Sequence, residues 1–136
     1  MISVYVAAAS APPELERAER WIARLRELGT IEVVSTWPGL VRAHGTNPTG
    51  VARQDRAAFA MGDLRELRKA DVLWLLAPND GVPGRGAYFE LGWAVGAGMT
   101  VVSSGQTEQS IFTALGYEFA LDIDAFRFLD AKAAGG

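Results

Sequence analysis

The sequence predicts an α/β fold of the doubly wound type, in which a mostly parallel sheet of five strands carries helices on both faces. Two observations lead to this prediction. Short apolar runs alternate along the chain with longer segments whose apolar residues recur at helical spacing. Several of the short runs are apolar at nearly every position, which is typical of parallel strands that are covered on both faces.

The predicted strands are the apolar, β-branched runs of the chain. The first is ISVYVAAA, which ends in small residues, and the clearest is DVLWLLA near the middle of the sequence. IEVVST and MTVVS are shorter runs, and YEFAL gives a last short strand. These strands span residues 2–9, 31–36, 71–77, 99–103 and 117–121.

Four helices are predicted between and after these strands. The first begins near Pro12, with Ser10 as a candidate cap, and ends before Gly29. Segment 37–50 contains two prolines and three glycines, so it is predicted to be a long loop without helical period. The predicted helices span residues 14–28, 51–69, 85–98 and 122–132.

The alternation of strands and helices predicts right-handed crossovers and a flavodoxin- or Rossmann-like three-layer sandwich. Residues 1–132 are expected to form a single domain, and residues 133–136 a frayed tail. Such sheets bind ligands where the carboxyl ends of the strands meet. We therefore expect functional residues in the loops 8–12, 37–50, 78–86 and 103–110.

Composition excludes several classes of protein. The chain has 136 residues, no cysteine and one histidine, so a disulfide scaffold, a cysteine nucleophile and a multi-histidine metal site are not expected. Its formal net charge is −3, which does not favour binding to a nucleic-acid polymer. No apolar run is long enough to span a bilayer, and no signal peptide is recognisable, so a cytoplasmic protein is expected.

Two carboxylates are the first candidates for chemistry. Glu90 lies among large apolar residues near the start of a predicted helix, where burial of a charge is costly unless the group has a partner or a task. An exposed glutamate favoured by the helix dipole is the other interpretation. Asp63 lies on the helix before the central strand, where the sequence taken alone favours an ordinary solvated charge.

The segment before the Glu90 helix suggests contact with an anion. Gly84 and Gly86 permit close approach of a ligand to the backbone, and Arg85 places a cation beside free backbone donors. A turn with unusual backbone angles and a surface arginine would explain the same residues. Asp80 belongs to an Asn-Asp-Gly turn signal, which requires no function.

Two aromatic residues have both structural and functional interpretations. Tyr5 lies within the first strand, where its hydroxyl could orient a carboxylate or simply be satisfied in the core. Trp37 could stack on a base, although a tryptophan at this position is also consistent with the core.

The stretch from Ala70-Asp71-Val72 through GRGAYFELGWA to GMTVV resembles the nucleoside 2-deoxyribosyltransferase superfamily. That family carries an ADV strand, a glycine-containing loop, a helix that begins with E-[LI]-G-[YWF]-A and a G-x-x-V strand. The opening ISVYVA is similar to the family's first strand, and Asp63 matches its D-L-x-x-[IL] segment. The resemblance covers most of the chain.

The resemblance implies an N-glycosidic enzyme that needs no cofactor or metal. It implies that Glu90 is the nucleophile toward the anomeric carbon, that Asp63 protonates or binds the departing base, and that Tyr5 holds the nucleophile. The intermediate would pass to another base or to water. The substrate would be a small nucleoside or nucleotide, and the chain would form a homodimer or a larger homo-oligomer.

The loops depart from the family pattern. The family's acidic residue before the glutamate helix has no direct counterpart, although Asp80 could replace it through a different loop path, and Ala8-Ala9-Ser10 stands where AGP is usual. We expect Ser10, Gly84, Arg85 and Gly86 to line the sugar or phosphate end, with Arg85 suited to a 5′-phosphate. We expect the segment that begins at Trp37 to select the base.

Two other functions remain open from the sequence, because doubly wound folds serve many activities. One is a non-catalytic nucleotide-binding or sensing module, which an exposed Glu90 would favour. The other is a protein-interaction domain without a ligand, which a crevice filled by Trp37 or Trp74 would favour.

Overall fold

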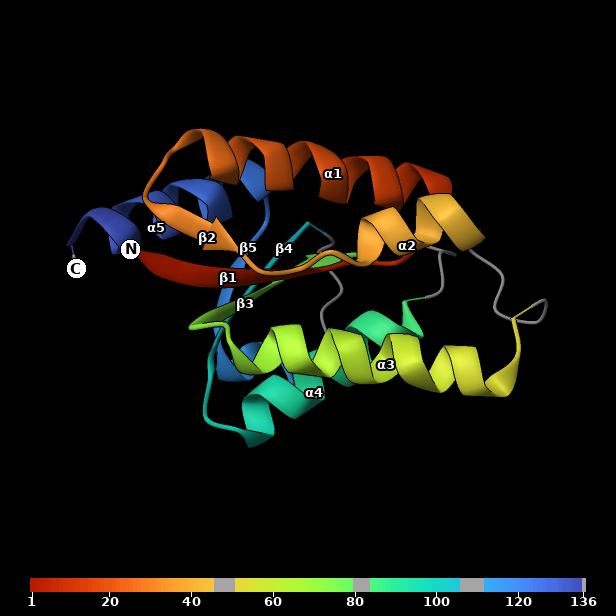
Figure 1. Ribbon diagram of the computed structural model, residues 1–136. Coiled ribbons are helices and arrows are strands. Elements are labelled where there is room, and N and C mark those ends of the chain that lie inside the picture. The colour runs from red at the N-terminus through yellow and green to blue at the C-terminus, as the bar shows by residue number, and fades with distance from the viewer. Residues whose placement is uncertain (46–50, 80–83, 106–111, 136) are drawn as a thin grey trace.

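The protein folds around a five-stranded, all-parallel sheet (Figure 1), seen in a computed structural model that describes residues 1–45, 51–79, 84–105 and 112–135. The strand order is β2-β1-β3-β4-β5, so the chain reverses its direction of travel between β1 and β3. This confirms the predicted doubly wound sheet. The strands are β1 (Ile2–Ala7), β2 (Ile31–Val33), β3 (Val72–Ala77), β4 (Thr100–Gly105) and β5 (Tyr117–Phe119).

Helices cover both faces of the sheet. Figure 1 shows α1 and α5 on one face and α3 and α4 on the other, with α2 at one end beside the carboxyl ends of β1 and β2. A short 3₁₀ turn, η2 (Thr113–Leu115), precedes β5. The helices are α1 (Pro12–Glu27), α2 (Trp37–His44), α3 (Arg53–Arg68), α4 (Arg85–Gly96) and α5 (Asp122–Gly135).

The prediction of a continuous loop over residues 37–50 is wrong for its first part, because Trp37–His44 forms α2. Pro38 lies in the first turn of this helix, where its missing N–H has no helical partner to lose. Gly45, at φ 86°, follows the helix and ends it. Residues 46–50 lie outside the described part of the chain.

Two helix ends also differ from the predictions. Ala11, not Ser10, occupies the position before the first turn of α1, and it makes no side-chain capping hydrogen bond. Helix α5 runs to Gly135, beyond the predicted end at Lys132, and Ala133 is buried. Packing of Ala133 on the core therefore continues the helix through residues that were expected to fray.

The core lies on both faces of β3, whose six residues are all fully buried. Trp74 points to the face covered by α1, where its ring lies 5.7 Å from that of Trp21. Tyr5 of β1 is fully buried and points to the opposite face, toward α4. The alternation of side chains along the parallel strands therefore turns Trp74 toward α1 and Tyr5 toward α4.

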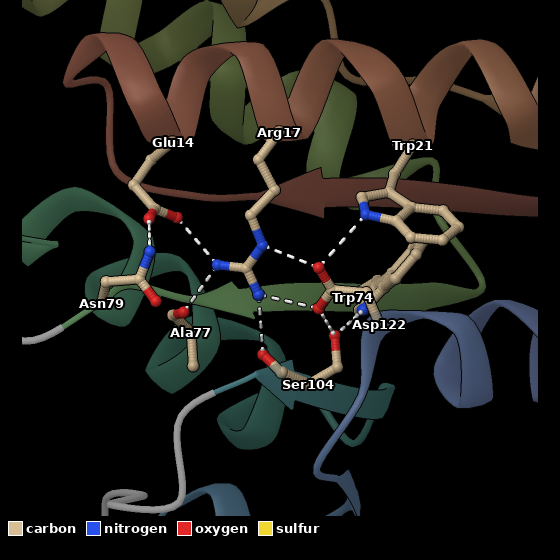
Figure 2. A network of polar contacts seen from close by, with 8 residues as sticks. All are labelled: Glu14, Arg17, Trp21, Trp74, Ala77, Asn79, Ser104 and Asp122. Carbon is tan, nitrogen blue, oxygen red and sulfur yellow. Dashed lines mark hydrogen bonds and ion pairs between the residues drawn. The ribbon is translucent and has the colours of Figure 1, made fainter.

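A charged network is buried beneath the α1 face (Figure 2). The guanidinium of Arg17 donates five hydrogen bonds, to Glu14, to Asp122 twice, and to the carbonyls of Ala77 and Ser104. A guanidinium has five N–H donors, so every donor has a partner. The network joins α1 and α5 to the carboxyl ends of β3 and β4.

No helix within the described ranges is both long enough and apolar enough to cross a membrane.

Candidate active site

A cavity of about 420 Å³ opens at the carboxyl ends of β1 and β3, between which the strand order reverses. This is the switch point of the sheet, the usual ligand position in doubly wound folds. The cavity is lined by the segment after β1, by α2, by the inner face of α3 and by the first turns of α4. Most of the predicted site residues line it, namely Ser10, Trp37, Asp63, Gly84, Arg85, Gly86 and Glu90.

Glu90 lines the cavity, and Tyr5 lies beneath it, fully buried and outside the lining. The Tyr5 hydroxyl donates a hydrogen bond to Oε2 of Glu90, which joins β1 to α4. Burial raises the pKa of Glu90 to about 8, the hydrogen bond from Tyr5 lowers it, and the negative charges of Asp63 and Glu66 raise it. Burial and the charge of Glu90 likewise raise the pKa of Tyr5, so the phenol stays protonated and acts as a donor.

Asp63 is a second carboxyl group on the cavity wall. It lies on α3, and burial together with the charge of Glu66 raises its pKa to about 6. The charge of Asp63 contributes to the raised pKa of Glu90, so the two carboxyl groups interact electrostatically. Paired carboxyls with separated pKa values near neutrality are typical of sites that combine a general acid with a nucleophile.

One wall of the cavity is apolar and aromatic. Residues Trp37, Leu40, Val41 and His44 line it from α2, and Phe59 lines it from α3. The rings of His44 and Phe59 lie 5.0 Å apart. Trp37 is buried, and its indole N–H donates to the carbonyl of Val6 at 2.7 Å, so its ring is held as part of the wall. The cavity remains open beside it, and Trp74 lies on the other face of the sheet.

The mouth of the cavity carries cations and backbone donors. Arg56 of α3 and Arg85 of α4 line it, and α4 begins there after Gly84. A Cβ atom on Gly84 would lie 2.8 Å from Cγ of Pro78, so a side chain at this position has no room. Gly86 has open space around its Cα. The first turn of α4 thus presents free N–H groups to the same cavity that Arg56 and Arg85 line.

The sequence analysis missed Arg56, Phe59 and the pocket-facing residues of α2. The signal for α2 was present, because Trp37, Leu40, Val41 and His44 follow helical spacing. Asp80, the remaining candidate, lies outside the described residues. Within the described ranges, no group of three or more His, Cys, Asp or Glu side chains is placed to hold a metal ion.

Comparison with known proteins finds relatives by structure but not by sequence. No protein-family model and no curated protein sequence matches the chain. The fold matches a 2-deoxyribosyltransferase from Bacillus psychrosaccharolyticus, with a TM-score of 0.72 and 18% identity over 96% of this chain and 95% of that one.

Two further structures show the same fold. The CMP N-glycosidase BcmB of Clostridium botulinum matches with a TM-score of 0.60 and 18% identity, over 95% of this chain and 98% of that one. A conserved protein from Enterococcus faecalis V583 matches with a TM-score of 0.68 and 15% identity, over 99% and 98%. The chain therefore shares its fold with a 2-deoxyribosyltransferase and a CMP N-glycosidase, which is the fold that the resemblance in the sequence implies.

Proposed function

We propose that this protein cleaves the N-glycosidic bond of a 2′-deoxynucleoside or its 5′-monophosphate through a covalent intermediate on Glu90. The observation that carries the proposal is the pair of carboxyls at the switch-point cavity, with Glu90 held from below by Tyr5 and Asp63 on the adjacent wall. The fold supports it, because it is shared with a 2-deoxyribosyltransferase and a CMP N-glycosidase.

In the first step, an oxygen of the Glu90 carboxylate forms a bond to the anomeric carbon. The bond from that carbon to the base breaks, and its electron pair stays on the base nitrogen. Asp63, in its protonated form, donates a proton to the departing base. The product is a glycosyl ester on Glu90, and Asp63 is left as a carboxylate.

In the second step, another base or a water molecule attacks the same carbon. The carbon–oxygen bond to Glu90 breaks, and the carboxylate that is released accepts a hydrogen bond from Tyr5. Asp63 accepts the proton of the attacking group and returns to its starting state. Transfer and hydrolysis differ only in which acceptor reaches the intermediate.

The lining of the cavity supports a substrate with an aromatic ring and an anionic end. The apolar wall formed by α2 and Phe59 suits a planar base, and Arg56 and Arg85 suit a phosphate at the mouth. A guanidinium forms strong charge-assisted hydrogen bonds with phosphate oxygens. We therefore favour the 5′-monophosphate over the free nucleoside.

The experiment that tests the function is a panel of 2′-deoxynucleosides and their 5′-monophosphates, incubated with and without an acceptor base. Free base is measured by chromatography, and the intact protein is weighed for a covalent sugar. Wild-type protein is compared with Glu90→Ala and with Glu32→Gln, a control on β2 outside the cavity lining. We expect base release and a mass adduct from the wild type and Glu32→Gln only. Base release by Glu90→Ala would overturn the role of Glu90.

A nucleotide-binding module without catalysis is the second candidate, and one observation favours it. With its pKa raised to about 8 by burial, Glu90 is mostly protonated at neutral pH and suited to hydrogen bonding. Binding of a nucleotide, measured by calorimetry, without release of base at any pH from 6 to about 9 would support this alternative.

We also propose that the protein is a homo-oligomer that uses the outer face of α4. Phe89 on this helix is 65% exposed, and the exposed Gly92 and Gly96 follow on the same helix. An apolar helix face is usually covered by protein, and small residues let two copies of one helix approach closely about a two-fold axis. Phe89→Glu is expected to convert the assembly to monomers in light-scattering measurements, and an unchanged mass would contradict this interface.

A further inference from the structure

Three consecutive residues that lead from β2 into α2 are hydrogen-bonded to neighbouring elements. Ser35 accepts a hydrogen bond from the N–H of Val6 at 3.1 Å, and the indole of Trp37 donates to the carbonyl of Val6. Thr36, between them, donates its backbone N–H to Glu66 at 3.0 Å and its hydroxyl to the other oxygen of the same carboxylate. The start of α2 is therefore held to β1 by its neighbours and to α3 by Glu66.

Glu66 lies one helical turn after Asp63 on α3 and is half-buried. The two helices that it joins form the cavity wall, since α2 contributes Trp37 and His44, and α3 contributes Phe59 and Asp63. The two side-chain contacts from one carboxylate fix both the position and the rotation of residue 36. A displacement there would move the whole first turn of α2 relative to Asp63.

We propose that Glu66 is a positioning residue that holds the first turn of α2 against α3 and so sets the shape of the cavity beside Glu90 and Asp63. As far as the reaction is concerned, this proposal rests on the proposed function. Glu66 does not line the cavity, and it acts through Thr36 and α2.

The charge of Glu66 also affects the pKa values of Asp63 and Glu90, which a purely structural role would leave unchanged. Burial is the largest cause of the raised pKa values of Asp63 and Glu90, and the charge of Glu66 adds to both. The ionisable side chains around Asp63 and Glu90 come from β1, α2, α3 and α4, and they are Tyr5, His44, Arg56, Glu66 and Arg85. Removal of one negative charge from this group lowers the pKa values of the remaining carboxyls.

Two substitutions separate the hydrogen bonds from the charge. Thr36→Val keeps the charge of Glu66 and the backbone N–H but removes the hydroxyl donor. Glu66→Gln removes the charge but keeps a carbonyl oxygen that accepts from Thr36. Glu66→Ala removes both. Glu32→Gln is the matched control, because Glu32 also accepts from a hydroxyl, that of Ser3 at 3.4 Å, and does not line the cavity.

The first measurement is amide hydrogen exchange across Trp37–His44 in the protein without substrate. We expect about tenfold faster exchange there in Glu66→Ala, a smaller increase in Thr36→Val, and none in the control. Exchange in β3, whose residues are fully buried, reports on global stability and is expected to change far less. Equal exchange in all four proteins would overturn the positioning role.

The second measurement is a carboxyl ¹³C NMR titration of Asp63 and Glu90. In Glu66→Gln both titrations are expected to move to lower pH by about half a unit, while Thr36→Val leaves them in place. Titrations that coincide in wild type and Glu66→Gln would contradict the inference. Neither measurement requires turnover, so its outcome is independent of whether the protein cleaves nucleosides.

Discussion

The hydroxyl of Tyr5, in the middle of β1, donates a hydrogen bond to the carboxyl of Glu90 on α4. The two residues are separated by 85 positions in the chain. Tyr5 is fully buried, so its only access to the cavity is through Glu90. The contact engages one carboxylate oxygen, and no described residue forms a hydrogen bond with the other.

Tyr5→Phe is predicted to raise the pKa of Glu90 above about 8, because the hydrogen bond from Tyr5 holds that pKa down against burial. The reaction needs ionised Glu90 and protonated Asp63, so kcat/KM should follow a bell with limbs near 6 and 8. In Tyr5→Phe the upper limb should move to higher pH, and the rate at neutral pH should fall by about tenfold or more. Tyr117→Phe, at an exposed site, should change neither.

A bell-shaped pH dependence of kcat/KM arises whether Asp63 or Glu90 carries the proton in the active form. Tyr5→Phe separates the two assignments, because it shifts the titration of Glu90 and makes its ionised form rarer. A rate that rises in this variant would contradict the assignment of Glu90 as nucleophile.

The strands could be predicted from the sequence because each is defined by local composition. The central strand is buried on both faces, so all its positions are apolar and no alternative helix of that length is plausible. Helix α2 was hidden by Pro38 and Gly39, which suggest a loop when taken alone. The helical signal was the spacing of Trp37 and Val41, which both line the cavity. The cavity itself cannot be seen in the sequence.

The site was predictable in part, for a similar reason. Glu90 stood out because a carboxylate among apolar residues is costly to bury, which is a local property. The role of Glu66 could not be seen, because its partner Thr36 lies 30 residues away. The buried role of Arg17 could not be seen either, because its partner Asp122 is 105 residues distant. Contacts of this range depend on sheet order, which local patterns do not encode.

Glu90→Gln is predicted to stabilise the protein at alkaline pH while abolishing cleavage. The folded state holds a proton on Glu90 up to about pH 8, whereas an unfolded glutamate loses it near 4.5. The folded state therefore binds more protons between these values, and the free energy of unfolding falls as pH rises through that window. The proton on Glu90 accounts for at most about 5 kcal/mol of this fall in the free energy of unfolding.

The check is guanidinium unfolding at several pH values between about 5 and 9. Asp63 adds to the same slope, since burial raises its pKa to about 6. Asp122 works in the opposite direction at low pH: although burial raises its pKa, hydrogen bonds from Arg17 and Ser104 hold it below the usual value. Wild-type stability should therefore be highest near pH 4 to 6. A Glu90→Gln protein with the same slope as wild type would contradict the prediction.

Arg17→Met is predicted to lower the free energy of unfolding by about 3–5 kcal/mol. Arg17 forms ion pairs with both Glu14 and Asp122, so the substitution leaves these two carboxylates without their cation (Figure 2). Adding Glu14→Gln and Asp122→Asn removes the uncompensated charges, so the triple variant should regain part of the loss.

Arg42→Met is the matched control for the buried network. Arg42 pairs with Glu19 at the surface, where the two side chains are 53% and 37% exposed. Such a pair contributes less than about 1 kcal/mol. Chemical unfolding of the variants measures these values, and equal losses in Arg17→Met and Arg42→Met would show that burial of the network adds nothing to its strength.

Gly84→Ala is predicted to impair ligand binding, whereas Gly86→Ala is tolerated. A Cβ on Gly84 would lie 2.8 Å from the ring of Pro78, and that ring follows the strand end held by Arg17 through the carbonyl of Ala77. Because Pro78 cannot move away cheaply, the start of α4 must shift, and with it the backbone donors at the cavity mouth. Gly86 has nothing within 4 Å of its added Cβ.

The measurement is nucleotide affinity by calorimetry, with thermal unfolding to show that both variants fold. We expect Gly84→Ala to bind at least about tenfold more weakly, the cost of losing one or two backbone hydrogen bonds to an anion. Gly86→Ala should bind like the wild type. Equal affinity in the two variants would mean that the first turn of α4 does not contact the ligand, and the phosphate would then depend on Arg56 and Arg85 alone.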